Sequence, residues 1–169
     1  MEVQVFMLRQ DDPTKCTAAK LVKFGLARPI RRTIRPTMVL DPFAAKIVLK
    51  TDGNVVNSIT AIDCSWEFAK KTFTRNFSGF SRRLPPLLAG NPVNYAKIGK
   101  LTTAEAIAAA LFIMGFDDQA HAILNKFKWG HTFFDLNQDL LKDYSNADTQ
   151  EKTVEISNDY GMAPKTFLE

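Results

Sequence analysis

The 169-residue sequence contains few of the residues and motifs that most often mark a functional site. Its two cysteines are too few for a disulfide framework, which favours a reducing cytosol. His121 and His131 have no third ligand at a suitable spacing, so we expect no metal site. There is no G-x-G-x-x-G, P-loop or G-x-S-x-G motif, which excludes dinucleotide, Walker-type nucleotide and serine-hydrolase sites.

The sequence also has no signal for secretion or for membrane insertion. Its start, MEVQVFMLRQ, carries an acid at position 2 and no basic region before an apolar stretch. The longest apolar run, residues 106–116, is too short to cross a bilayer. We therefore expect a cytoplasmic protein without a membrane partner.

Charge is distributed unevenly along a chain whose net charge is only +4. Residues 1–36 hold eight basic and three acidic side chains, whereas residues 135–169 hold three basic and eight acidic ones. Such asymmetry is typical of a protein that lays one face on a polyanion, although an ordinary solvated surface would give the same count. A hydrophobic content of 46% indicates a globular fold.

Strand and helix patterns alternate in the first half of the chain. This alternation predicts an α/β fold with a parallel sheet, whose ligands bind at the carboxyl ends of the strands. Asp63 falls at such an end. The predicted strands are residues 3–8, 38–40 and 58–63, and the predicted helices are residues 11–25 and 64–73.

From about Pro85 onward the pattern becomes entirely helical. Helical periodicity covers residues 102–116, 117–127 and 133–147 and continues into a final polar segment. We therefore predict an α/β domain at residues 1–85 and an all-helical domain at residues 86–169. The two would share the functional site.

Thr102 and Glu105 form a capping-box signature, which predicts a helix beginning at this point. Thr103 would then lie in the first turn, where unpaired N–H groups and the helix dipole favour a carboxylate or phosphate. The alternative is that this capping box only stabilises the helix and binds no ligand. Cys16 and Cys64 are expected to be small buried hydrophobes rather than nucleophiles.

Five blocks in order resemble one family, the small-subunit (16S/18S) rRNA aminocarboxypropyltransferases of archaea and eukaryotes. They are DDPTKCTAAKLVKFGLAR, VLDPF, IDCSW, RRLPPLLAGNPVNYAKIGKLTTAEAIAAAL and KFKWGHTFFDLN, and they span most of residues 9–144. The chain departs from the family at Ala89-Gly90, where Ala-Ala is usual, and at Ala96, where Gly is usual. Eukaryotic members also tend to have Cys near Thr103.

The resemblance implies a transferase of ribosome biogenesis that uses S-adenosylmethionine. Its 3-amino-3-carboxypropyl group would pass to N3 of a pseudouridine, N1-methylated in many members, in small-subunit rRNA, with release of methylthioadenosine. The implied fold is that of the knotted SPOUT RNA methyltransferases, with a deep trefoil knot, and we expect a monomer. A SPOUT-type RNA methyltransferase and a non-catalytic rRNA-binding assembly factor remain alternatives.

The resemblance also implies roles for individual residues. Asp63 would face the acceptor, where it could act as a general base, and Trp66 would pack near the sulfonium. The remaining cofactor-binding positions are the Ile62 backbone at the ribose, Leu84 and Gly99 at the adenine, and Thr17 with Thr103 at the methionine carboxylate.

A set of basic residues is expected to bind RNA phosphates. If the sheet is parallel, they should lie along the same edge as Asp63 and hold the backbone while the base enters the pocket. They are Lys15, Lys20, Lys23, Arg28, Arg31, Arg32, Arg35, Arg82 and Arg83.

Overall fold

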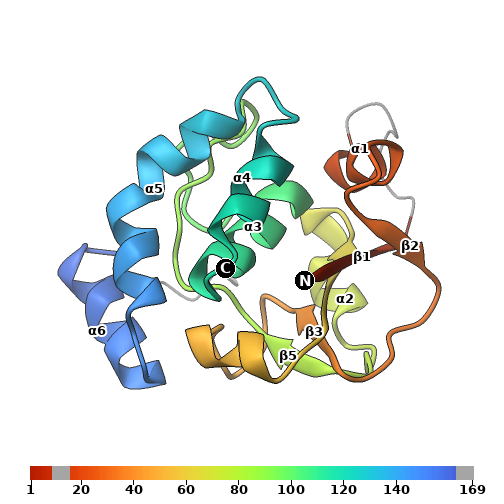
Figure 1. Ribbon diagram of the computed structural model, residues 1–169, viewed down its shortest axis with the longest axis horizontal. Coiled ribbons are helices and arrows are strands. Elements are labelled where there is room, and N and C mark those ends of the chain that lie inside the picture. Colours follow the sequence, from red (N-terminus) through yellow and green to blue (C-terminus); the bar gives the residue numbers. More distant parts are fainter. Residues whose placement is uncertain (9–15, 163–169) are drawn as a thin grey trace.

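The computed structural model describes residues 1–8 and 16–162 of the chain, which form a parallel sheet and a set of helices (Figure 1). The strands are β1 (Glu2–Met7), β2 (Arg28–Ile30), β3 (Thr37–Leu40), β4 (Ser58–Asp63) and β5 (Phe80–Arg82). The α-helices are α1 (Thr17–Lys23), α2 (Ala69–Thr72), α3 (Thr103–Ile113), α4 (Asp117–Leu124), α5 (Gly130–Ser145) and α6 (Gln150–Asp159). Two 3-10 helices are η1 (Lys50–Asn54) and η2 (Trp66–Phe68).

The five strands are all parallel and lie in the order β2-β1-β4-β3-β5. In this register Met7 lies opposite Asp63, and Leu40 lies opposite Ala61. The carboxyl ends of β1, β3 and β4 therefore meet at one edge of the sheet. The predicted parallel α/β architecture is confirmed, and Asp63 ends its central strand.

β4 is central because it is apolar enough to be covered on both faces. Five of its six residues are buried, as is typical of strands in parallel sheets. Its Thr60 hydroxyl lies 2.8 Å from the Thr37 hydroxyl and donates to Gln4 at 3.1 Å. These contacts across three strands satisfy polar groups that would otherwise be unpaired in the core.

The helices of the second half pack against the sheet in successive layers. Figure 1 shows α3 and α4 between the sheet on one side and α5 and α6 on the other. α3 is buried on nearly every side because it contacts β4, α4 and α5. One apolar core runs without a break from Val3 in β1 to Met162 beyond α6. The boundary near residue 85 remains a prediction.

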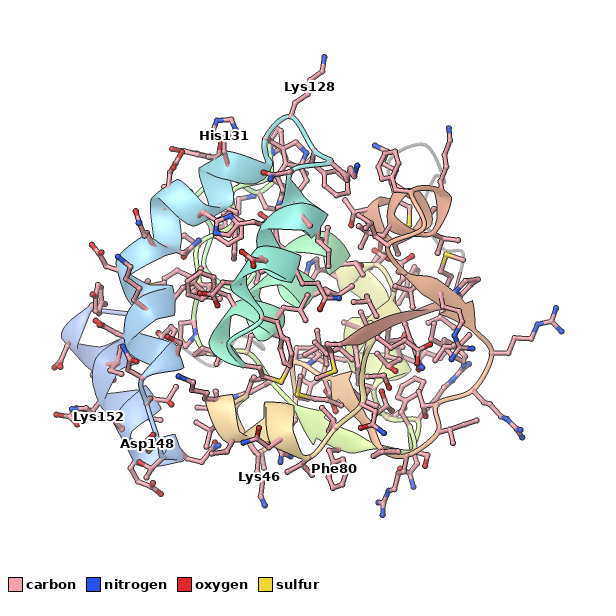
Figure 2. The ribbon with its side chains drawn as sticks, in the orientation of Figure 1. Lys46, Phe80, Lys128, His131, Asp148 and Lys152 are labelled. Carbon is pink, nitrogen blue, oxygen red and sulfur yellow. The ribbon has the colours of Figure 1, made fainter. Side chains whose placement is uncertain are left out.

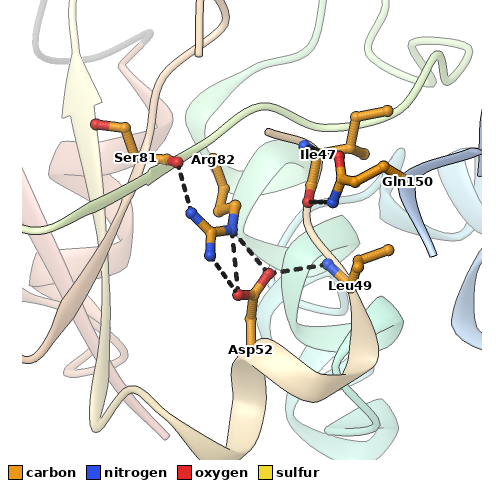
Figure 3. A network of polar contacts seen from close by, with 6 residues as sticks. All are labelled: Ile47, Leu49, Asp52, Ser81, Arg82 and Gln150. Carbon is orange, nitrogen blue, oxygen red and sulfur yellow. Dashed lines mark hydrogen bonds and ion pairs between the residues drawn. The ribbon is translucent and has the colours of Figure 1, made fainter. Parts of the chain in front are cut away.

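Residues 46–48 extend the sheet beyond β5. Val48 N–H donates to the Arg83 carbonyl, and Arg83 N–H donates to the Lys46 carbonyl, each at 2.9 Å. The Gln150 side chain of α6 then pairs with the Ile47 backbone, accepting its N–H at 2.6 Å and donating to its carbonyl at 2.8 Å. Figure 3 shows this amide pairing beside the ion pair of Asp52 and Arg82.

Several elements differ from the sequence-based expectation. The short strand β2 was not predicted, because Pro29 lies in its middle. The helix predicted over residues 64–73 is only η2 followed by the four-residue α2. The first helix begins after Cys16, and residues 11–15 of its predicted span lie outside the described residues. After β5 the named elements of the described chain are all helices.

Candidate active site at the carboxyl end of the central strand

Three elements converge on the Asp63 carboxylate. Oδ1 accepts a hydrogen bond from the Thr103 hydroxyl of α3 at 2.8 Å, and Oδ2 accepts one from the Cys16 thiol before α1 at 3.1 Å. Asp63 is half-buried, so it has contact with solvent as well as with these donors. The side chain is therefore held in one orientation at the edge of the sheet.

Cys16 is a hydrogen-bond donor rather than the simple buried hydrophobe that the sequence predicts. Its sulfur also caps α1 by accepting the Ala19 N–H at 3.3 Å. Burial, together with the neighbouring Asp63 carboxylate, raises the pKa of the thiol to about 11 from an ordinary 9.0. Since the thiol is protonated at neutral pH, it donates to Asp63 and is a poor nucleophile.

The first turn of α3 has the predicted capping box. The Thr102 hydroxyl accepts the Glu105 N–H at 3.3 Å, and Glu105 accepts the Thr102 N–H at 2.7 Å. The Thr17 hydroxyl accepts the Ala104 N–H at 3.2 Å, so α1 and α3 are joined at this turn. Thr17 and Thr103 are thus brought together, as predicted, at a helix end that favours anions.

The Thr103 hydroxyl proton is already donated to Asp63, which changes the expected binding of a carboxylate. The Thr17 hydroxyl can still donate a hydrogen bond, because its oxygen only accepts the Ala104 N–H. The Thr103 backbone N–H has no acceptor within the described part of the chain. These two donors are the ones available to an incoming carboxylate.

Glu105 holds the loop before α3 from inside the protein. The side chain is fully buried and accepts the N–H groups of Gly90 at 2.7 Å and Asn91 at 3.0 Å. It also accepts the Asn91 side-chain amide at 2.8 Å. The sequence identified the cap but missed this second role, because no local pattern links Glu105 to residues 14 and 15 positions earlier.

The structure shows the backbone at the two loop positions where the sequence departs from the pattern that it resembles. Ala96 has φ of 58°, a left-handed conformation that suits the family's usual Gly better than Ala. A Cβ on Gly90 would lie 2.5 Å from the Phe133 backbone nitrogen. In this chain the loop therefore approaches α5 more closely than an alanine at position 90 would allow.

Trp66 lies next to the same helix end, on η2. Its indole N–H donates to the Leu101 carbonyl at 3.3 Å, and the residue is 40% exposed. The Lys100 ammonium lies 4.8 Å from the ring centroid. The ring is thus held at its N–H edge and already attracts one cation, which a cationic ligand would have to displace from that face.

The other predicted cofactor contacts lie on adjoining backbone. Ile62 is buried near the end of β4, and Leu84 is half-buried just beyond β5. Gly99, with φ of 73°, immediately precedes Lys100 and gives its N–H to the Leu87 carbonyl at 2.9 Å. The Gly99 N–H is therefore already used within the protein.

Part of the predicted RNA-binding set lies where it was expected. Arg31 and Arg32 are exposed directly after the carboxyl end of β2. Lys23 is exposed at the end of α1, which starts beside Asp63 and leads to the amino end of β2, so its expected position at the Asp63 edge was wrong. Lys20 is half-buried on the same helix. Arg28 begins β2 at the amino side of the sheet and pairs with Glu2, the first residue of β1, at 2.6 Å, so its expected position at the Asp63 edge was wrong. Lys15 lies outside the described residues.

The remaining arginines do not form the predicted rim. Arg35 lies before β3, at the amino edge of the sheet, with its guanidinium 5.7 Å from the Phe80 ring, so its expected position was wrong. Figure 2 shows Phe80 at the lower margin of the molecule. Arg82 binds Asp52 with distances of 2.8–3.1 Å, and Arg83 donates to the carbonyls of Ala44 and Ala45. Both guanidinium groups are already engaged in internal contacts.

The acidic end of the chain forms the side of the molecule farthest from β2. α5 and α6 lie at the opposite end from β2 in Figure 1, and Asp148 and Lys152 project from that side in Figure 2. His131 points outward at the start of α5, and the described residues contain no group of three or more potential metal ligands. Within the same residues no helix is long and apolar enough to span a membrane.

Comparison with solved structures identifies the same fold in a functional relative. The structure of the SAM-dependent rRNA:acp-transferase Tsr3 from Vulcanisaeta distributa matches with a TM-score of 0.83 and 37% identity, covering 95% of this chain and 93% of that one. The 16S rRNA aminocarboxypropyltransferase of Methanobrevibacter smithii is 43% identical over 168 residues, which are 95% of this chain and 97% of that protein. The chain belongs to the aminocarboxypropyltransferase family.

Further matches agree with membership of the aminocarboxypropyltransferases. The relative from Thermoplasma acidophilum is 46% identical over 156 residues, covering 90% of this chain and 94% of its own. The family model described as "Ribosome biogenesis protein, C-terminal" matches residues 38–161. A model described as "Possible Fer4-like domain in RNase L inhibitor, RLI" matches residues 3–35. Since those residues contain Cys16 as their single cysteine, they lack the four thiolates of an iron–sulfur cluster.

Proposed function

We propose that this protein transfers the 3-amino-3-carboxypropyl group of S-adenosylmethionine to N3 of a pseudouridine in small-subunit rRNA. The observation that carries the proposal is the convergence of Asp63, Trp66 and the first turn of α3 at one sheet edge, in a chain that matches aminocarboxypropyltransferases over nearly its whole length. Each of these groups suits one part of the reaction.

The residues at this edge fit S-adenosylmethionine. The exposed Trp66 ring suits a sulfonium, because aromatic faces attract cations. The first turn of α3, with the Thr103 N–H and the Thr17 hydroxyl, suits the methionine carboxylate. The bound cofactor supplies an electrophilic γ-carbon, and its carbon–sulfur bond breaks with the electron pair leaving on methylthioadenosine.

Asp63 is the residue placed to receive the N3 proton of the acceptor. Its carboxylate oxygens accept from Thr103 and Cys16, and each oxygen has a second lone pair for an incoming N–H. Because the two donors come from different helices, the carboxylate cannot turn away from the edge without breaking both bonds. Proton removal makes N3 nucleophilic as the bond to carbon forms.

The position of S-adenosylmethionine relative to the acceptor determines which of its carbons reacts. The acceptor can attack only the carbon presented to it, so a site that covers the methyl group and exposes the γ-carbon favours the larger transfer. Trp66 is the side chain that would cover the methyl group. A site that exposed the methyl group and covered the γ-carbon would instead methylate RNA, which is the alternative activity.

We further propose that the chain has the trefoil knot of SPOUT proteins and that the protein acts in the cytoplasm as a monomer. The parallel sheet and the similarity to the Tsr3 structure support the knotted fold. Pseudouridine with prior N1-methylation is the acceptor implied by the family.

Product analysis tests the proposed function. The protein is incubated with S-adenosylmethionine and an RNA hairpin that contains pseudouridine, and the small-molecule products are separated by mass. Methylthioadenosine together with a modified pseudouridine is expected. S-adenosylhomocysteine would show a methyltransferase instead. Absence of S-adenosylmethionine binding by calorimetry would leave an assembly factor that binds rRNA.

Asp63→Asn tests the assigned base. It should keep S-adenosylmethionine affinity within about twofold and lose at least about 100-fold in turnover, since general-base groups contribute roughly that much. Asp118→Asn, an exposed acid on α4, is the matched control and should retain full turnover. Equal loss of affinity and turnover in Asp63→Asn would indicate a structural role for the carboxylate.

A further inference from the structure

Lys100 occupies a place in the site that the family resemblance did not assign. Its ammonium lies over the Trp66 ring at 4.8 Å, while the next residue, Leu101, accepts the indole N–H at 3.3 Å. Two consecutive residues of the loop thus contact the face and the edge of the same ring. Three positions after Lys100, Thr103 donates to Asp63. Lys100 is therefore within the reaction site rather than on the outer basic surface.

The backbone of Lys100 is fixed while its side chain can move. The Lys100 carbonyl accepts the Asn91 side-chain amide at 3.4 Å, and Asn91 is bound in turn to the buried Glu105. The side chain is exposed, and no carboxylate of residues 1–8 or 16–162 pairs with its ammonium. The contact with Trp66 is a single cation–π interaction, which is weak at exposed sites.

Cofactor binding brings a second positive charge to the same indole. A sulfonium beside Trp66 competes with the lysine ammonium for the ring and repels it at short range. The ammonium has the reach and the three donors to find another partner. The methionine carboxylate already has the first turn of α3, so the partner left for Lys100 is an anionic group of the RNA.

We infer that Lys100 is a substrate-positioning residue that leaves Trp66 when S-adenosylmethionine binds and then binds a phosphate beside the target nucleotide. This inference rests on the proposed function. The binding affinities of the two substrates are therefore coupled, because S-adenosylmethionine releases the Lys100 ammonium from Trp66 and the ammonium then binds an RNA phosphate. RNA therefore binds more tightly to the cofactor-loaded protein, and by linkage the cofactor binds more tightly in the presence of RNA.

The coupling is measured with three variants of the full-length protein. Lys100→Met keeps the length of the side chain and removes its charge, Lys100→Arg keeps the charge, and Lys97→Met removes an exposed lysine from the same loop as a control. The affinity of a fluorescent RNA hairpin, with N3-methylpseudouridine at the target position so that N3 cannot accept the transferred group, is measured with and without S-adenosylmethionine. The affinity for S-adenosylmethionine alone is measured by calorimetry.

The wild-type protein and Lys97→Met should bind the hairpin about fivefold or more tightly in the presence of S-adenosylmethionine, which is the usual range of such coupling. Lys100→Met should lose this gain while binding S-adenosylmethionine equally well or more tightly, and Lys100→Arg should keep most of the gain. Undiminished coupling in Lys100→Met would overturn the inference. Weaker cofactor binding in Lys100→Met would also overturn it, since Lys100 would then support Trp66.

Product analysis of the wild-type protein separates this inference from the proposed function. If the wild-type protein forms methylthioadenosine but Lys100→Met keeps the coupling, only the role of Lys100 is wrong. If the wild-type protein forms no methylthioadenosine, the proposed function fails and the inference falls with it.

Discussion

A carboxylate at the end of a strand keeps one orientation only if neighbouring elements donate to it, and Asp63 has two such donors. The Cys16 thiol and the Thr103 hydroxyl come from separate helices, α1 and α3, and bind different oxygens. Neither helix could shift along the sheet edge without weakening its bond to Asp63. The packing of two helices is therefore linked to the geometry of one side chain.

Trp66→Ala should weaken S-adenosylmethionine binding. The substitution removes a large apolar surface and any cation–π attraction, which together are worth on the order of 1 to 3 kcal/mol. Global folding should persist, because Trp66 is 40% exposed and lies outside the core. Calorimetry measures the affinity, and Trp129→Phe, at the start of α5, is a control. An unchanged affinity would show that Trp66 has no contact with the cofactor.

Cys16→Ser should flatten the pH dependence of stability in the alkaline range. The folded pKa of Cys16 is raised to about 11 from 9.0, so the unfolded chain releases this proton first as the pH rises. The stabilising contribution is complete below pH 9 and is lost progressively between pH 9 and pH 11. Serine keeps the cap and the donor to Asp63 but does not titrate there.

The measurement is the free energy of unfolding of both proteins, by urea denaturation, from pH 7 to pH 11. Because tyrosines and lysines also titrate in this range, the quantity of interest is the difference between the two proteins. That difference should shift in favour of Cys16→Ser above pH 9. A constant difference would mean that the thiol has an ordinary pKa in the folded protein.

At the scale of the elements, one ion pair joins η1 to β5. Arg82 contacts both oxygens of Asp52, which also accepts the Leu49 N–H, as Figure 3 shows. The two side chains are only 17% and 12% exposed, so the pair differs from the surface ion pairs that contribute little. It fixes the 3-10 turn against the last strand of the sheet.

Arg82→Met should destabilise the protein by about 3 kcal/mol, because it leaves the Asp52 carboxylate largely buried without its counterion. Asp52→Asn should have a cost of similar size. The double variant should lose clearly less than the sum of the two, since neither partner is then left charged and alone. Urea denaturation of all four proteins gives the coupling, and additive losses would argue that each residue acts independently.

Local sequence patterns were sufficient to predict some of the helices and strands but not others. β4 and α3 were predicted well, because an apolar run and a capping box are local signals that packing does not override. β2 was missed, since three residues with a central proline form a strand only by pairing with β1. The helix expected from residue 64 is divided into η2 and the four-residue α2. Trp66 of η2 donates to Leu101, a contact between distant residues that leaves no local signal in the sequence.

The sequence identified several residues of the candidate site, but it did not predict the hydrogen bonds among them. Family resemblance gave Asp63, Thr17, Thr103 and Trp66, and the structure brings Asp63, Thr17 and Thr103 to one helix end. The Cys16 bond, separated from Asp63 by 47 residues, had no local signal. Nor did the internal bonds of Arg82 and Arg83, which depend on a loop that folds back beside β5.

Over the whole molecule, charge separates into two ends. Arg31 and Arg32 follow β2, while the acidic helices α5 and α6 lie at the opposite end (Figure 1). A polyanion approaching this field is drawn to the β2 end and repelled from the other. The candidate site lies between them.

Arg31→Ala combined with Arg32→Ala should weaken the binding of matched and scrambled RNA hairpins alike. Phosphate binding releases counterions, so the log–log slope of affinity against salt should fall by about 0.7 to 0.9 for each phosphate that the protein no longer neutralises. S-adenosylmethionine affinity should not change. Lys142→Ala combined with Lys152→Ala, on the acidic side, is the matched control. Unchanged RNA binding at low salt in the arginine variant would place the footprint elsewhere.

The pairing of Gln150 with Ile47 has a consequence for how this protein behaves among other chains. An open parallel sheet ends in unpaired peptide groups that can template the addition of a foreign strand. On the β5 side, the Gln150 amide takes the N–H and the carbonyl of Ile47 as a further strand would. On the β2 side, Pro29 removes a donor from a strand of three residues. Both edges of the sheet are therefore protected from pairing with a strand of another chain. At one edge this protection comes from a side chain of α6, 103 residues away in sequence.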